Sequence, residues 1–113
     1  MKPSRAHPAA RRELRAAIAR DETEYPGRGI RLLHAVEAVV RRVENVPQSA
    51  PIWAGVTSKF EIRGAKVRRH PYIVVYAIHP DHLVLVAVAH TSRFPGYWAS
   101  RVDDYVPKSG KRK

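Results

Sequence analysis

Apolar positions in the N-terminal part of the chain recur with the period of a helix. In "HPAARRELRAAIARDETEY" they stand three or four residues apart, which predicts a helix from about Pro8 to Glu22 with the proline in its first turn. The same spacing in "GIRLLHAVEAVVRRVEN" predicts a second helix from about Gly29 to Asn45. The intervening "PGRG" favours a tight break. A link this short predicts that the two helices are antiparallel neighbours.

After "NVPQSAP" the period changes to two, which is typical of strands. In "KFEIR", Phe60 and Ile62 alternate with charged residues, so one face of this segment is apolar. The runs "YIVVYAI", from Tyr72 to Ile78, and "LVLVAVA", from Leu83 to Ala89, are apolar on both faces, as in central strands. Only "HPDH" separates them, which predicts an antiparallel pair joined by a turn.

The order helix, helix, strand, strand, strand predicts an α+β fold, in which a helical hairpin packs on an antiparallel sheet of three to four strands. Val67 is out of phase with the strand before it, which predicts a bulge or bend at Gly64–Ala65. Residues 1–7 contain a proline and few apolar side chains, so the pattern leaves a fourth, N-terminal edge strand open. The length suits one domain with one core, which we place at residues 1–105, followed by a basic tail at 106–113.

Charge narrows the classes of partner. The net charge is +11, which favours polyanions such as nucleic acid or a ribosome, or an acidic protein. The chain has no cysteine, and no apolar run reaches the roughly 18 residues that a membrane helix needs, so we expect a cytoplasmic protein without a membrane partner. The six histidines do not form a recognisable metal motif, and no nucleotide-binding loop is present, so we expect no cofactor.

Candidate chemistry gathers around the strands. The first hairpin carries five cations, at Lys59, Arg63, Lys66, Arg68 and Arg69. The last strand is followed by "HTSRFPGYWASR", which holds His90, Arg93, Phe94, Tyr97, Trp98 and Arg101. Cations interleaved with aromatic rings suit RNA binding, and His90 and Tyr97 are titratable groups for metal-free RNA cleavage. In the alternative interpretation Trp98 and Phe94 cover the core and Tyr97 is a surface ring.

Four pieces of the chain together resemble the RelE/ParE superfamily, the toxins of type II toxin–antitoxin systems, which are also associated with plasmid stabilisation. In order, they are "HPAARREL", "YPGRGIRLLHAVEAVVRRVENVP", "RRHPYIVVYAI" and "VLVAVAHTSRFPGYWASR". The resemblance implies an edge strand, two helices and a three-stranded antiparallel meander. It further implies a growth inhibitor that a cognate antitoxin neutralises by binding the two-helix face and the sheet.

The resemblance implies one of two targets. ParE-like members inhibit DNA gyrase, whereas RelE-like members cut mRNA on the ribosome without a metal. Lys66 and Tyr97 match nuclease positions, but Ile73 and Thr91 stand where two arginines of the nucleases are expected, with Arg93 two residues further on. A phosphorane without well-placed cations loses an important electrostatic contribution.

We therefore favour ParE-like inhibition of gyrase and leave open whether the protein is an enzyme. The first alternative is a metal-independent endoribonuclease, and the second is a non-toxic nucleic-acid-binding module. In the nuclease case the catalytic candidates are His90, Arg93 and Tyr97. The candidates for binding nucleic acid or another target are Lys59, Arg63, Lys66, Arg68, Arg69, Trp98 and Arg101.

Overall fold

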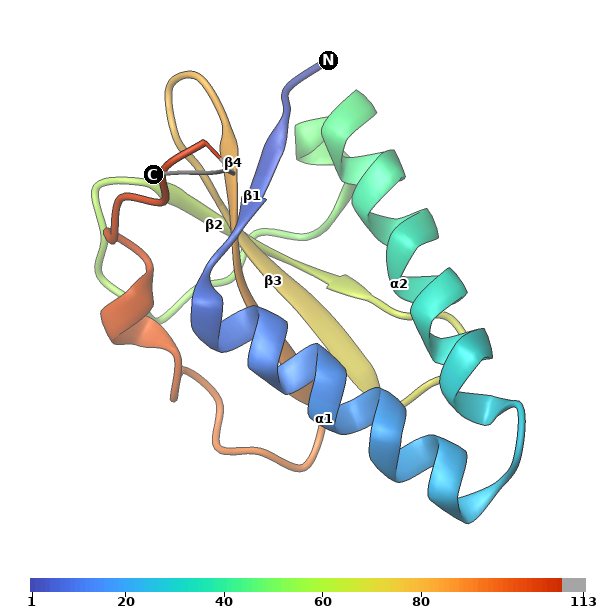
Figure 1. Cartoon of the computed structure of the whole chain (residues 1–113). Helices are drawn as coiled ribbons and strands as arrows, with labels where there is room; N and C mark the ends of the chain where they lie inside the picture. The colour runs from blue at the N-terminus through green and yellow to red at the C-terminus, as the bar shows by residue number, and fades with distance from the viewer. Residues whose placement is uncertain (109–113) are drawn as a thin grey trace.

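The computed structural model describes residues 1–108 and shows two helices packed on a four-stranded mixed sheet (Figure 1). The elements are β1 (Ser4–Ala6), α1 (Pro8–Glu24), α2 (Arg28–Asn45), β2 (Glu61–Lys66), β3 (Tyr72–Ile78) and β4 (Leu83–His90), with short 3-10 turns at Pro47–Ser49 and Ala99–Arg101. The strand order is β1-β4-β3-β2, and both helices lie on one face of the sheet. The predicted α+β arrangement is confirmed.

The strand that the pattern left open is present. β1 pairs with β4 in parallel, Ser4 opposite Leu83 and Ala6 opposite Leu85, so the sheet is mixed where the sequence predicted an antiparallel one. Backbone groups hold β1 in place: the N–H of Leu83 donates to the carbonyl of Pro3, and the N–H of His7 donates to that of Leu85. Because this pairing needs few apolar side chains, the hydrophobic pattern carries little sign of it.

The helical hairpin follows the prediction closely, although α1 runs on to Glu24 and α2 begins at Arg28. Gly27 takes a φ of 92°, a conformation that suits glycine, and turns the chain between the helices. The carboxylate of Glu22 accepts hydrogen bonds from the backbone N–H groups of Gly27 and Gly29, at 2.7 and 3.0 Å. A residue of α1 thereby satisfies donors at the start of α2 that would otherwise lack partners.

The predicted bulge at Gly64–Ala65 is wrong. β2 pairs without interruption with β3, from Glu61 opposite Ile78 to Lys66 opposite Ile73. Val67 is out of phase with Phe60 and Ile62 because both faces of this segment are covered: Ile62 packs on one face of the sheet, whereas Ala65 and Val67 pack on the other, beneath the helices. The register shift lies elsewhere, between β3 and β4 at Val75/Tyr76.

Both faces of the sheet are covered, so residues 1–108 form two apolar clusters rather than the single core that the sequence predicted. The helix-side cluster includes Leu32, Val43 and Tyr76. The opposite cluster includes Trp98 and Val106 and is covered by the irregular segments on either side of the strands, residues 51–60 and 97–106. Val106 is buried, so the packed domain extends into the predicted tail; residues 109–113 of that tail lie outside the described part of the chain.

Candidate functional site

The strand register brings the predicted chemistry to one end of the sheet. Lys66, the last residue of β2, pairs with Ile73, and Tyr72, the first residue of β3, pairs with His90, the last of β4. Beside them is an open cleft of about 390 Å³ lined by Glu13, Ala16, Arg20, Tyr72, Val88, His90, Ser92 and Arg93. This sheet end, together with the loop that follows β4, is the candidate site for target binding or catalysis.

Glu13 on α1 organises this cleft, and it was not among the residues predicted from the sequence. Its Oε1 accepts a hydrogen bond from the backbone N–H of Val88 at 3.1 Å. Its Oε2 accepts a hydrogen bond from the Tyr97 hydroxyl at 2.7 Å and forms an ion pair with Arg101 at 3.0 Å. Glu13 stands three residues after Ala10 and four before Ala17, two buried positions of α1, and this spacing could have identified it.

Tyr97 holds its proton firmly in this setting. Burial, the hydrogen bond to Glu13 and the negative charge of that carboxylate raise the pKa of Tyr97 from 10.0 to about 12, against the opposing effect of Arg93 and Arg101. The hydroxyl therefore stays protonated near neutral pH. A general base works best when its pKa lies near the working pH, so Tyr97 is poorly placed to take a proton from a ribose hydroxyl.

His90 and Arg93 are also engaged locally. The backbone N–H of Ser92 donates to Nδ1 of His90 at 3.0 Å, and the Ser92 hydroxyl lies 2.8 Å from the same nitrogen. The guanidinium of Arg93 lies 3.9 Å from the centre of the Tyr97 ring, as a cation–π contact. All three predicted catalytic residues are thus near one another, but each of them has a structural partner.

Four of the seven residues predicted to bind a target do not contribute an open surface at this end. Trp98 is 1% exposed and fills the second apolar cluster against Trp53, so it is a core residue, as in the alternative interpretation. Arg63 donates to the carbonyls of Gln48 and Ala50, and Arg101 donates to that of Val86. Lys59 is exposed but precedes β2, at the end opposite to Lys66.

The remaining three, Lys66, Arg68 and Arg69, are exposed and line a second cleft of about 380 Å³ between the β2–β3 turn and α2. Arg42 of α2, which was not predicted, completes the lining together with Ala35, Ala38 and Val39. Arg42 could have been found from its spacing, because residues 35, 38 and 42 share one side of a helix. We call this cavity, with its four cations, the basic cleft.

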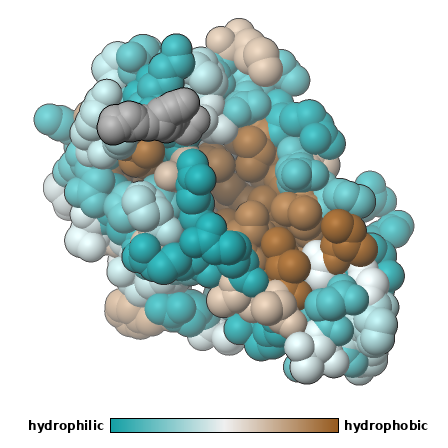
Figure 2. Space-filling model, viewed as in Figure 1, coloured by the Kyte–Doolittle hydropathy of each residue, from teal (hydrophilic) through white to brown (hydrophobic). Residues whose placement is uncertain are grey.

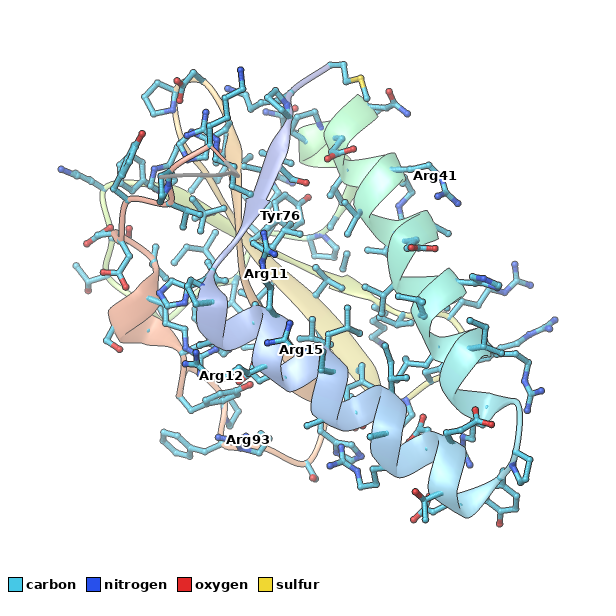
Figure 3. All side chains as sticks on the ribbon, in the orientation of Figure 1. Arg11, Arg12, Arg15, Arg41, Tyr76 and Arg93 are labelled. Carbon is cyan, nitrogen blue, oxygen red and sulfur yellow. The ribbon has the colours of Figure 1, made fainter. Side chains whose placement is uncertain are left out.

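A third surface is apolar. A groove of about 330 Å³ runs between α1 and α2 above the sheet, and its lining includes Leu14, Leu33, Val36, Val40, Val74 and Leu85. Figure 2 shows this hydrophobic patch open on the face of the molecule that carries the helices. Arg11 on α1 and Arg41 on α2 line it from its two sides (Figure 3), and Glu37 adds a single carboxylate. We call this surface the interhelix groove.

Three further findings concern residues 1–108. No group of three or more histidine, aspartate or glutamate side chains in this range is arranged to hold a metal ion. Neither helix has the length and apolar character needed to cross a bilayer. His79 and His82, which flank the β3–β4 turn, are buried: His79 stacks on Phe60, and His82 pairs with Asp81.

Two helices on one face of a small mixed sheet, with an edge strand before them, are the arrangement that the resemblance to the RelE/ParE superfamily of toxins implied. Residues 5–95 match the family described as the ParE toxin of the type II toxin–antitoxin system parDE. This protein belongs to the ParE toxin family and is the toxin component of such a system. The resemblance inferred from the four sequence pieces is confirmed, and with it an antitoxin as partner.

The fold agrees with a solved structure. The one described as "Chromosomal ParDE TA system from P. aeruginosa" matches with a TM-score of 0.63 and 14% identity, over 80% of this chain and 96% of that chain. At this identity the likeness supports the fold alone. A comparison with curated protein sequences gives no match.

Proposed function

We propose that this toxin acts by binding and inhibiting a protein target, with DNA gyrase as the first candidate, and that it does not cut RNA. The observation that carries this proposal is the 2.7 Å hydrogen bond from the Tyr97 hydroxyl to Glu13, which engages the tyrosine at the nuclease position in a contact within the protein. Membership of the ParE family supports gyrase as the target class. We expect the protein to work in the cytoplasm, where such a target is found.

The surroundings of Tyr97 support the same choice. Metal-free cleavage of RNA needs a base for the 2′-hydroxyl and cations aimed at the phosphorane. The cleft offers Arg20 and Arg93, but Arg93 lies on the Tyr97 ring, and Arg20 donates to the Tyr72 hydroxyl at 2.7 Å. The lone pair of His90 Nδ1 already accepts from Ser92. These contacts engage His90, Arg20 and Arg93 within the protein, which argues against their use as a base or as cations on the phosphorane.

The test compares Tyr97→Phe with the matched variant Tyr105→Phe, whose ring is 74% exposed. We expect both to arrest growth on induction, to give no new RNA 5′ ends inside translated frames, and to block supercoiling by purified gyrase. Loss of arrest with Tyr97→Phe alone, together with new 5′ ends from the unaltered protein, would establish the RelE-like nuclease instead. Growth arrest without new 5′ ends and without a block of supercoiling would be consistent with inhibition by binding but would exclude gyrase as the target.

We further propose that the interhelix groove is where the antitoxin binds. Its half-buried apolar side chains, among them Leu33 and Val40, are available to a partner, and a helix or extended segment with apolar side chains on one face fits such a groove. Arg11 and Arg41 on the two sides favour acidic residues beside that apolar face.

To test this, Val40→Glu, inside the groove, is compared with Ile30→Glu on the same helix. Ile30 is 48% exposed and lies outside the groove lining. We expect both variants to remain toxic when expressed alone, and only Val40→Glu to escape neutralisation by the co-expressed antitoxin. Neutralisation of Val40→Glu as complete as that of Ile30→Glu would remove the groove from the interface.

A further inference from the structure

We propose that the basic cleft binds the phosphate backbone of a nucleic acid, so that this toxin contacts nucleic acid as well as its protein target. The inference goes beyond the proposed function and does not depend on it, because it rests on a different surface. The cleft is formed by Arg42 of α2 together with Lys66, Arg68 and Arg69 at the end of β2 and in the following turn.

The cations of the basic cleft have no neutralising partner among the residues that the structure describes. Within residues 1–108 none of the four forms an ion pair with a carboxylate, and none donates a side-chain hydrogen bond to the protein. The other side chains that line the cleft are two alanines and a valine. Four cations around one concavity repel one another, so an anion that enters it gains attraction from all of them.

The backbone of the turn supports a role for these side chains beyond packing. Arg69 takes a φ of 71° and is the only residue other than glycine with positive φ in the described range. Glycine or asparagine is the usual choice at such a position, because a larger side chain is strained there. The turn therefore carries two successive exposed arginines, Arg68 and Arg69, in a place where local geometry alone favours a smaller residue.

The positive charge continues past the turn, which favours a polymer over a small anion. Tyr72 pairs with His90 at the end of the sheet where β2 ends in Lys66. The neighbouring cleft, which Arg20 and Arg93 line, is therefore at the same end. β2 and β4 are two strand spacings apart, roughly 10 Å. One nucleic-acid strand carries a charge about every 3.4 Å along a duplex, so this distance matches about three phosphates.

The chemistry of the basic cleft favours nucleic acid over an acidic protein. A protein partner gains most of its affinity from apolar anchors in pockets, and the interhelix groove offers those. The basic cleft offers alanine methyl groups and three guanidinium groups, which are suited to bidentate contacts with phosphate oxygens. The apolar surface and the phosphate-binding chemistry are thus on separate parts of the molecule.

The experiment measures binding of the full-length protein to a labelled single-stranded oligonucleotide and to the duplex of the same sequence, by fluorescence anisotropy over a salt series. The test variant is Arg68→Gln with Arg69→Gly, in which glycine suits the positive φ and protects the fold. The matched control is Arg12→Gln with Arg15→Gln, which removes the same charge from exposed positions of α1.

We expect the test variant to reduce the salt slope on single strands by about 1.4, from two contacts at about 0.7 each. If the variant and the wild type bind equally at about 1 M salt, this change in slope makes the variant bind roughly tenfold more weakly than the wild type at physiological salt. The control should change the slope by less than half as much, and Arg68→Lys should keep it. Circular dichroism and thermal melting confirm that each variant is folded.

Three results would overturn the proposal. The first is no salt-dependent binding of either oligonucleotide. The second is an equal loss in the test and control variants, which would mean diffuse attraction by the net charge of +11. The third is displacement of the oligonucleotide by polyglutamate as effectively as by unlabelled nucleic acid, which would assign the cleft to acidic polypeptides.

Discussion

Replacing Glu13 with alanine tests the network that holds the end of β4. One carboxylate joins three elements here: it accepts from the Val88 N–H in β4, accepts from Tyr97 in the following loop and pairs with Arg101. The β1–β4 pairing ends at Ala6 opposite Leu85, so Glu13 takes over the outer edge of β4 beyond the last partner strand. The side chain of Glu13 is 17% exposed and that of Arg101 is 18% exposed.

These contacts set the size of the effect. The N–H of Val88, a residue 7% exposed, loses its partner, and an unsatisfied buried donor costs about 1–3 kcal/mol. The pair with Arg101 is partly open to water, so its loss costs less than the 3–5 kcal/mol typical of a fully buried pair. Arg101 also keeps its hydrogen bond to the Val86 carbonyl. We therefore expect Glu13→Ala to lower the free energy of unfolding by about 3 kcal/mol.

Urea denaturation followed by circular dichroism measures this change. With an m value of about 1.5 kcal/mol per molar urea, a loss of about 3 kcal/mol lowers the midpoint by roughly 2 M. The matched control is Glu24→Ala, an exposed carboxylate at the end of the same helix, for which we expect a change within about 0.5 kcal/mol. A Glu13→Ala midpoint indistinguishable from that of Glu24→Ala would refute the idea that Glu13 organises this end of the sheet.

Three other predictions follow from single positions. The pKa of Tyr97 is about 12 in the folded protein, against 10.0 for an ordinary tyrosine. Its contribution to stability is therefore complete below about pH 10 and is lost as the pH rises toward 12. Across that window the urea midpoint of the wild type should fall more steeply than that of Tyr97→Phe. Gly29→Ala should lower the free energy of unfolding by about 1–2 kcal/mol in thermal melts, because the new Cβ would lie 2.6 Å from the Ile18 carbonyl oxygen. A gain in stability would contradict this close contact between the two helices. Trp98→Ala should lower the free energy of unfolding, measured in urea, by about 3–5 kcal/mol. A loss below about 1 kcal/mol would mean that the apolar cluster around Trp98 does not unfold together with the sheet.

The elements predicted from the sequence are those whose signal lies within a contiguous run. Both helices repeat one period over many residues, and the two central strands are continuous apolar runs. The positions predicted for all four agree with the structure to within a few residues. β1 has three residues and is held by backbone hydrogen bonds, so hydropathy could not identify it. The second apolar cluster was missed for a related reason, since the segments that cover it, residues 51–60 and 97–106, are largely irregular and have no period.

The sequence predicted that cations gather near the strands, but not which of them are held by contacts within the protein and which remain exposed. The sequence shows that cations follow the strands, yet Arg63 and Arg101 donate to backbone carbonyls, while Lys66 and Arg68 remain exposed. Only tertiary contacts separate these cases. Glu13 acts on residues 75 and 84 positions away, so its role depends on the fold and not on any local motif.

Helix α2 relates the two proposed binding surfaces to each other. Leu33, Val36 and Val40 line the interhelix groove, whereas Ala35, Ala38 and Arg42 line the basic cleft. The two sets repeat at three- and four-residue spacings that are offset from one another, so they occupy different sides of one helix. A partner in the groove therefore leaves the side with Arg42 uncovered unless it also wraps around α2. Whether neutralisation by the antitoxin releases nucleic acid then depends on how far the antitoxin extends beyond the groove, and not on competition for the same side chains.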